Sequence, residues 1–189
     1  MQTRSISTLF LAFTATLALA GCGHGGSIST RTGGTGTLNV FLTDAPIDLT
    51  DVLSVNVTLA GVTIYPAETS DPTGISTETS PVSLLTHPAT FDLLTLTGGA
   101  TALLASGEVP AGNYSRIRLE ISDATLIYKD ATTVPLKIDS NKVDVPIRFH
   151  VTVGADNSVA LDFDAGASVQ VNETGSGTFI LRPVVTPVP

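Results

Sequence analysis

The sequence has no tryptophan, one cysteine and few basic residues, and each shortage excludes something. With Cys22 as its only cysteine the chain cannot close an internal disulfide, so a folded domain must depend on core packing. Aromatic residues are 5% of the chain, which argues against a stacking platform for sugars or a glycosidase cleft. The nine basic residues are scattered, so we expect no basic patch. A net charge of −8 also predicts no nucleic-acid partner.

Long hydrophobic runs are missing except over residues 6–20, which lie between Arg4 and Cys22. This run has the length of a secretory signal peptide and is short for a transmembrane helix. The residues Leu19-Ala20-Gly21-Cys22 resemble a bacterial lipobox. The resemblance implies that residues 1–21 are a lipoprotein signal peptide and that Cys22 becomes the lipidated first residue. The alternatives are an ordinary secretory signal followed by a stray cysteine, or a buried core helix.

The lipobox also implies a location. Several acyl chains on one residue hold a protein firmly at a membrane, whereas a single chain binds marginally. Gly23 rather than aspartate follows Cys22, which in the lipoprotein sorting pattern favours the outer membrane of a Gram-negative cell. We therefore expect a lipid-anchored protein of the bacterial cell envelope, with the membrane as its partner through the acylated Cys22.

Composition divides the rest of the chain into two parts. After the lipidated cysteine, residues 22–36 are rich in Gly, Ser and Thr, which is typical of a flexible tether. Residues 37–186 are long enough for one domain with an adequate core. Their abundant Thr, Val and Gly, without long helical patterns, predict an all-β fold.

Alternation of apolar and polar residues predicts about nine short strands, too many apolar faces for one exposed sheet. Two antiparallel sheets packed face to face, a β-sandwich, are the economical arrangement. The clearest predicted strands cover residues 37–43, 52–65, 114–122, 126–129, 134–138, 143–153, 159–163 and 178–185.

Two of these segments carry further detail. In the second strand the buried face begins at Leu53 and changes side at Ala60-Gly61, which predicts a β-bulge. In residues 143–153 the alternation would bury Val153, and Pro146 indicates a sheet edge or an irregularity. Residues 100–105 could form one helical turn.

The turn before residue 114 suggests a structural role for a tyrosine. Gly112 allows a tight turn, and Tyr114 follows it at the start of a strand. A tyrosine in this position often hydrogen-bonds back to the preceding loop as a tyrosine corner. The alternative is a plain surface tyrosine.

Four blocks of the chain then resemble one family in their order. They are residues 38–46; residues 91–104, which contain Phe91-Asp92-Leu93-Leu94 and Gly98-Gly99; residues 110–119, which open with Pro110-Ala111-Gly112-Asn113-Tyr114; and residues 161–183, which open with Leu161-Asp162-Phe163-Asp164. Together they resemble the domain of unknown function (DUF) 4382 family, which is typical of bacterial lipoproteins and exported proteins. The resemblance implies an Ig-like or transthyretin-like β-sandwich and no particular reaction.

Candidate chemistry is sparse. His24, His87 and His150 are far apart in the sequence, and a zinc site without a free cysteine would need carboxylates as well. The serines lie in no nucleophile motif. We therefore expect no catalytic residues and no enzyme.

Carboxylates are the better candidates for a site. Asp44, Asp48 and Asp51 follow the first strand, and Asp162 and Asp164 alternate at the end of another. Loops at the end of a sandwich can supply the oxygens that Ca²⁺ prefers, although the spacing matches no known calcium loop. The alternative is that these residues serve solubility and protect a strand edge.

These observations favour a non-catalytic binding, adhesive or structural module without a resident cofactor. It would meet a protein or glycan partner at the cell surface. The alternative is a carbohydrate-binding or calcium-assisted ligand-binding domain.

Overall fold

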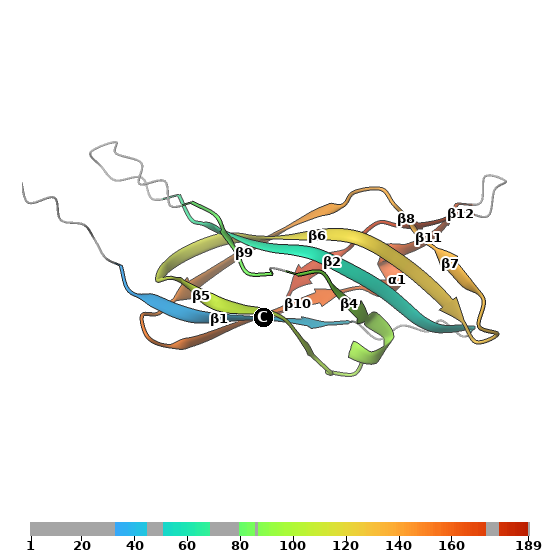
Figure 1. Ribbon diagram of the computed structural model, residues 1–189, viewed down its shortest axis with the longest axis horizontal. Helices are drawn as coiled ribbons and strands as arrows, with labels where there is room; N and C mark the ends of the chain where they lie inside the picture. Colours follow the sequence, from blue (N-terminus) through green and yellow to red (C-terminus); the bar gives the residue numbers. More distant parts are fainter. Residues whose placement is uncertain (1–32, 45–50, 69–79, 86, 173–177, 189) are drawn as a thin grey trace, which may run out of the picture. The chain divides into compact units, whose positions relative to one another are not determined.

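Strands make up most of the described chain in this computed structural model (Figure 1). The structure describes residues 33–44, 51–68, 80–85, 87–172 and 178–188. The elements in chain order are β1 (Thr35–Thr43), β2 (Val52–Pro66), β3 (Val82–Ser83), β4 (Ala89–Asp92), η1 (Leu93–Leu96), β5 (Ala102–Pro110), β6 (Gly112–Tyr128), β7 (Thr133–Pro135), β8 (Lys137–Ile138), β9 (Lys142–Val151), β10 (Asp156–Phe163), α1 (Ala165–Ser168), β11 (Val169–Asn172), β12 (Thr178–Leu181) and β13 (Val185–Pro187).

The strands form three open sheets that pack together, so the predicted all-β sandwich is confirmed. Sheet A has the order β13-β10-β1-β5, and sheet C has the order β11-β12-β8. Sheet B has the order β3-β2-β6-β7, with β4 also paired to β2 and β9 also paired to β6. The prediction of purely antiparallel sheets is wrong, because β1 pairs with β10 and β12 with β8 in parallel. Alternation in a sequence reports which face is buried and carries no information on the direction of the neighbouring strand.

The core lies between the inner faces of sheets A and B. Strands β1, β2, β6 and β10 contribute its largest fully buried side chains. Among them are Leu38, Leu42, Leu59, Ile64, Ile117, Leu119, Leu161 and Phe163. Burial of each such side chain contributes about 1.5–3 kcal/mol, which is how a chain with a single cysteine can hold this fold together.

Strand β2 contains the predicted bulge. Its register with β6 shifts between Thr58 and Leu59 and again between Leu59 and Gly61, and the buried face passes from Val57 to Val62 across this point. A second irregularity lies between Val52 and Ser54. It leaves Leu53 59% exposed, so the expectation that Leu53 is buried is wrong.

Strand β9 fulfils most of its predicted alternation, since Val145 and Val151 are fully buried. Val153 is 61% exposed because the strand ends at Val151, so that expectation is wrong. In the described part of the chain β9 pairs with β6 alone, and the register shifts between Tyr114 and Arg116, close to Pro146. Both readings of Pro146, an edge and an irregularity, are therefore confirmed.

The predicted helical turn at residues 100–105 is wrong. Gly98 and Gly99 adopt positive φ angles, after which strand β5 runs antiparallel along β1. The helical turn lies earlier, in η1, where the Asp92 side chain accepts a hydrogen bond from the Leu94 amide at 3.2 Å. The predicted strand 178–185 also divides between β12 and β13, which belong to different sheets.

Candidate functional site

A groove opens on the outer face of sheet B, where the end of β2, the start of β6 and the end of β9 lie side by side. Its volume is about 990 Å³. Charged and polar side chains line it together with apolar ones such as Pro66, Pro146 and Phe149. The polar and charged lining includes Tyr65, Glu68, Asn113, Arg116, Arg148 and His150. A concave surface that combines apolar contact with a few polar groups is typical of a binding site.

Strand alternation turns the arginines of β6 into this face. Ile117 is fully buried, so its neighbours Arg116 and Arg118 point away from the core. The register of β6 with β2 shifts between Arg116 and Tyr114 and leaves Ser115 as an extra residue on β6, so Tyr114 also faces inward.

Tyr114 forms a rigid floor beneath the groove. Its hydroxyl donates a hydrogen bond to the Pro110 carbonyl at 2.7 Å, which is the contact expected of a tyrosine corner. The ring stacks on Phe149, with centroids 5.2 Å apart and an interplanar angle of 10°. Burial raises the pKa of the Tyr114 hydroxyl. Gly112 supplies the turn, with a φ of +152°.

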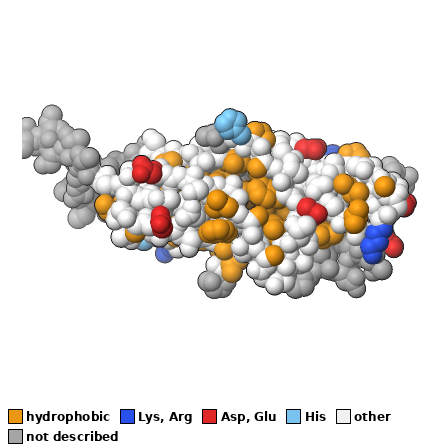
Figure 2. Space-filling view, turned by 60° about the horizontal axis from the view of Figure 1, so that its bottom comes forward, with side chains coloured by type: hydrophobic (Ala, Val, Ile, Leu, Met, Phe, Trp, Pro, Cys, Tyr) orange, Lys and Arg blue, Asp and Glu red, His pale blue; other side chains and the backbone are white. Residues whose placement is uncertain are grey.

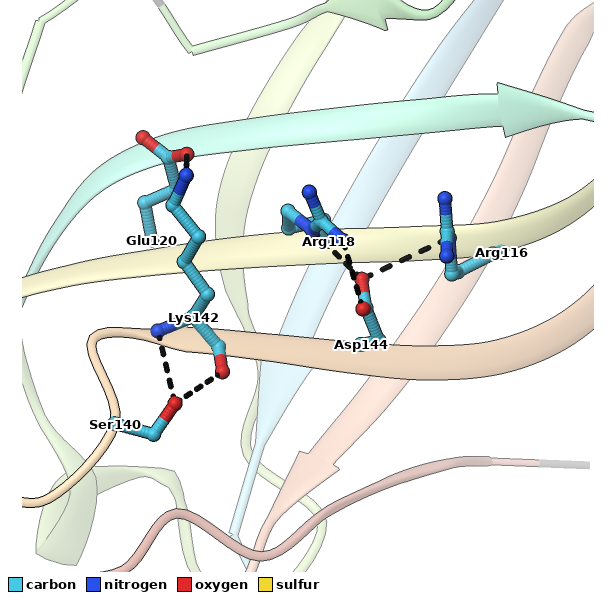
Figure 3. Close-up of polar contacts among 6 residues, drawn as sticks. All are labelled: Arg116, Arg118, Glu120, Ser140, Lys142 and Asp144. Carbon is cyan, nitrogen blue, oxygen red and sulfur yellow. Dashed lines mark hydrogen bonds and ion pairs between the residues drawn. The ribbon is translucent and has the colours of Figure 1, made fainter.

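Asp144 on β9 accepts two hydrogen bonds from Arg118, at 2.7 and 2.8 Å (Figure 3). Arg116 reaches the same carboxylate at 3.7 Å. The hydrogen bond with Arg118 lowers the pKa of Asp144 and raises the pKa of Arg118. The guanidinium of Arg116 also lies 3.9 Å from the centroid of the Tyr65 ring, within the range of a cation–π contact.

Basic residues that are scattered in the sequence come together on this face, interleaved with acidic ones. Lys142 pairs with Glu120 at 3.4 Å, and Arg148 follows two residues beyond Pro146 on the same outward side of β9. The β6–β9 pairing brings these side chains next to the arginines of β6, although the two strands are well separated in the sequence. Only strand pairing brings these charges together, so counting charges along the sequence did not reveal the arrangement.

His150 completes the groove at its far end. Its Nδ1 lies 2.9 Å from the Asn113 side-chain oxygen across the strand pair. The alternation within residues 143–153 is enough to turn His150 outward, but it does not indicate Asn113 as the neighbour.

The predicted acidic residues are only partly brought together. Asp162 on β10 pairs with Thr43 on β1, and Thr43 directly precedes Asp44 in the sequence. Asp44 is 3% exposed and accepts a hydrogen bond from the Ala165 amide at 2.8 Å. Asp164 lies beyond the strand and accepts from the Ala167 amide at 2.8 Å. It therefore caps α1 instead of sharing an outward strand face with Asp162.

Asp51 is exposed at the start of β2, in another sheet. Asp48 and Cys22 lie outside the described residues. Within the described ranges no three His, Cys, Asp or Glu side chains form a group suited to a metal ion. Of the described carboxylates at the end of sheet A, Asp44 and Asp164 thus have local structural roles, because each accepts a hydrogen bond from a backbone amide.

A second surface, on sheet A, has a different chemistry. Figure 2 shows hydrophobic side chains gathered in the middle of the face that carries β1 and β5. Leu103 is 53% exposed there, opposite the half-buried Phe41 in the β1–β5 register. The outer faces of sheets A and B are therefore apolar and charged, respectively.

Comparison of the chain with known protein families gives a match. Residues 35–183 match the family described as Domain of unknown function (DUF4382). No curated protein and no solved structure matches the chain. No helix within the described ranges is long and apolar enough to cross a membrane. The family match covers most of the chain, which therefore belongs to the DUF4382 family.

Proposed function

We propose that this protein is a lipid-anchored protein of the bacterial cell envelope whose sandwich is a non-catalytic binding module. The observation that carries the proposal is the groove on sheet B, which combines guanidinium groups, a tyrosine ring and an Asn–His pair. The lipobox at Cys22 supports the anchored location, and Gly23 supports the outer membrane.

The chemistry of the groove supports binding over catalysis. Arginine is protonated at all physiological pH values and cannot serve as a general base. The His150 ring hydrogen-bonds to the Asn113 side chain and, among the described residues, to no carboxylate or serine, so it does not form the His–carboxylate or Ser–His pair of a hydrolase. The groups that face the groove are suited to holding a ligand by charge and hydrogen bonds.

The anchor is tested by replacing Cys22 with serine and feeding cells an alkyne-tagged fatty acid. The parent protein should incorporate the tag and sediment with outer-membrane fractions. The C22S variant should incorporate none. Labelling of C22S, or an unlabelled parent protein, would contradict the anchor.

The binding role is tested by affinity capture from detergent-solubilised envelopes with the full chain as bait. A stoichiometric component should be retained by the parent protein and lost from R148E, because Arg148 lines the groove. R182E is the matched control, since Arg182 pairs with Asp139 at 2.8 Å in another part of the fold. Repeated recovery of nothing, or equal recovery with R148E, would contradict a binding function for the groove.

A further inference from the structure

The outer face of β6 and β9 is a series of cross-strand rows, and the first two rows are internally neutral. Lys142 pairs with Glu120 in the first row, and Arg118 pairs with Asp144 in the second (Figure 3). Opposite charges across an antiparallel pair stabilise the sheet, and a bidentate guanidinium–carboxylate contact is the strongest form of such a pair. In both rows the partner of the cation is a carboxylate.

The third row breaks the series. Arg116 faces Pro146 in the strand register, where an acidic residue would continue the pattern. Arg148 comes next on β9, and no described residue forms an ion pair with it. The remaining contact of Arg116 with Asp144 is 3.7 Å long, and that carboxylate already bonds Arg118. Both guanidinium groups line the groove.

The other charges that face the groove leave this positive character in place. Glu68 lines the groove from the segment after β2 and supplies one negative charge against the two guanidinium groups of Arg116 and Arg148. His150 also lines the groove and carries no negative charge. On a chain with a net charge of −8, a local excess of cations is a specific feature.

We propose that the groove binds an acidic carbohydrate, whose carboxylate takes the place between Arg116 and Arg148 that Pro146 leaves without an acid. This inference rests on the proposed binding function and specifies its ligand. The prolines at positions 66 and 146 offer apolar surface against the C–H face of a sugar ring, while Asn113 and His150 offer hydrogen-bonding groups for its hydroxyls. The planar guanidinium forks match the two oxygens of a carboxylate.

The test is calorimetric titration of the full chain, kept in mild detergent, with trigalacturonate. We expect saturable binding that weakens as salt is raised, because the groove is open to solvent. R148Q and R116Q should each weaken it roughly tenfold, since each removes a charge-assisted hydrogen bond. R182Q is the matched control and should leave the affinity unchanged. Unaltered melting temperatures of all three variants would show that they remain folded.

Two further titrations identify the recognised group. Maltotriose, which has hydroxyls but no carboxylate, should bind at least tenfold more weakly than trigalacturonate. Inorganic phosphate should bind weakly, and equal or tighter binding of phosphate through the same arginines would overturn the assignment of a carboxylate. Absence of heat with trigalacturonate, or binding that R148Q and R116Q do not change, would overturn the inference.

Failure of the inference is distinguishable from failure of the proposed function. If trigalacturonate does not bind but R148E still loses its envelope component, the groove is a binding site for another ligand class. If neither experiment responds to Arg148, both proposals fall.

Discussion

Replacement of Tyr114 by phenylalanine should remove one hydrogen bond and leave the packing of the ring in place. The hydroxyl donates to the Pro110 carbonyl at 2.7 Å, and the residue is only 3% exposed. Its stacking on Phe149 does not need the hydroxyl. The variant therefore isolates the tyrosine corner from the rest of the core.

The expected loss is about 1 kcal/mol in the free energy of unfolding, the typical net worth of one hydrogen bond. Pro110 is exposed, so its carbonyl can bond water in the variant and the loss should not greatly exceed this value. For a chain of this size the melting temperature should fall by roughly 2–4 °C. Y114A, which also removes the ring, should cost about 3–5 kcal/mol.

Urea unfolding followed by circular dichroism measures both variants. Tyr128 provides the control, because it is half-buried and contacts Phe179 edge-on, while its hydroxyl makes no hydrogen bond to the described residues. Y128F should change stability by less than about 0.5 kcal/mol. If Y114F and Y128F prove equally stable, the corner does not contribute and the reasoning is refuted.

The same variant has a pH signature. Burial raises the pKa of Tyr114, so above pH ~10 the unfolded chain loses this proton before the folded chain does. The corresponding stability is complete below pH ~10 and is lost as the pH rises further. The advantage of the parent protein over Y114F should therefore shrink between pH 8 and pH 10.5. An advantage that grows over this interval would contradict the assigned direction.

The remaining predictions concern three other positions. D44A should lower the free energy of unfolding in urea by about 1–3 kcal/mol, because the Ala165 amide loses its buried acceptor. D44N, which keeps an acceptor oxygen, should lower it by less, and equal losses from the two variants would contradict this role. G112A should cost about 1–3 kcal/mol, since its φ of +152° suits only glycine, and a neutral effect on melting would show that the turn relaxes. In an NMR titration Asp144 should ionise below its ordinary pKa and move back toward it in R118Q, since Arg118 holds the carboxylate; no movement would remove Arg118 as the cause. Any stability from this pair is present above the ordinary pKa of aspartate and is lost as the pH falls through the lowered value.

Local pattern was sufficient for much of the fold. The alternation in β6 and β9 correctly identified their buried faces, and the change of side at Ala60 correctly located a bulge. The errors fall where the chain leaves regular pairing. Leu53 sits at an irregularity and Val153 follows a strand end, so neither is buried by its parity. Residues 100–105 were misjudged because the two glycines before them reverse the chain into a strand.

The sequence by itself indicated the all-β class, the turn that precedes Tyr114 and an edge or irregularity at Pro146, because these features show in the residue pattern of short segments. Strand direction and partner choice depend on contacts between distant segments. Only the tertiary structure therefore decided that β1 lies parallel to β10 and that Arg116 and Arg148 share one groove. Charged residues of different strands form a site only when strand pairing brings their side chains together. The alternation within one strand does not indicate which strand will be its partner.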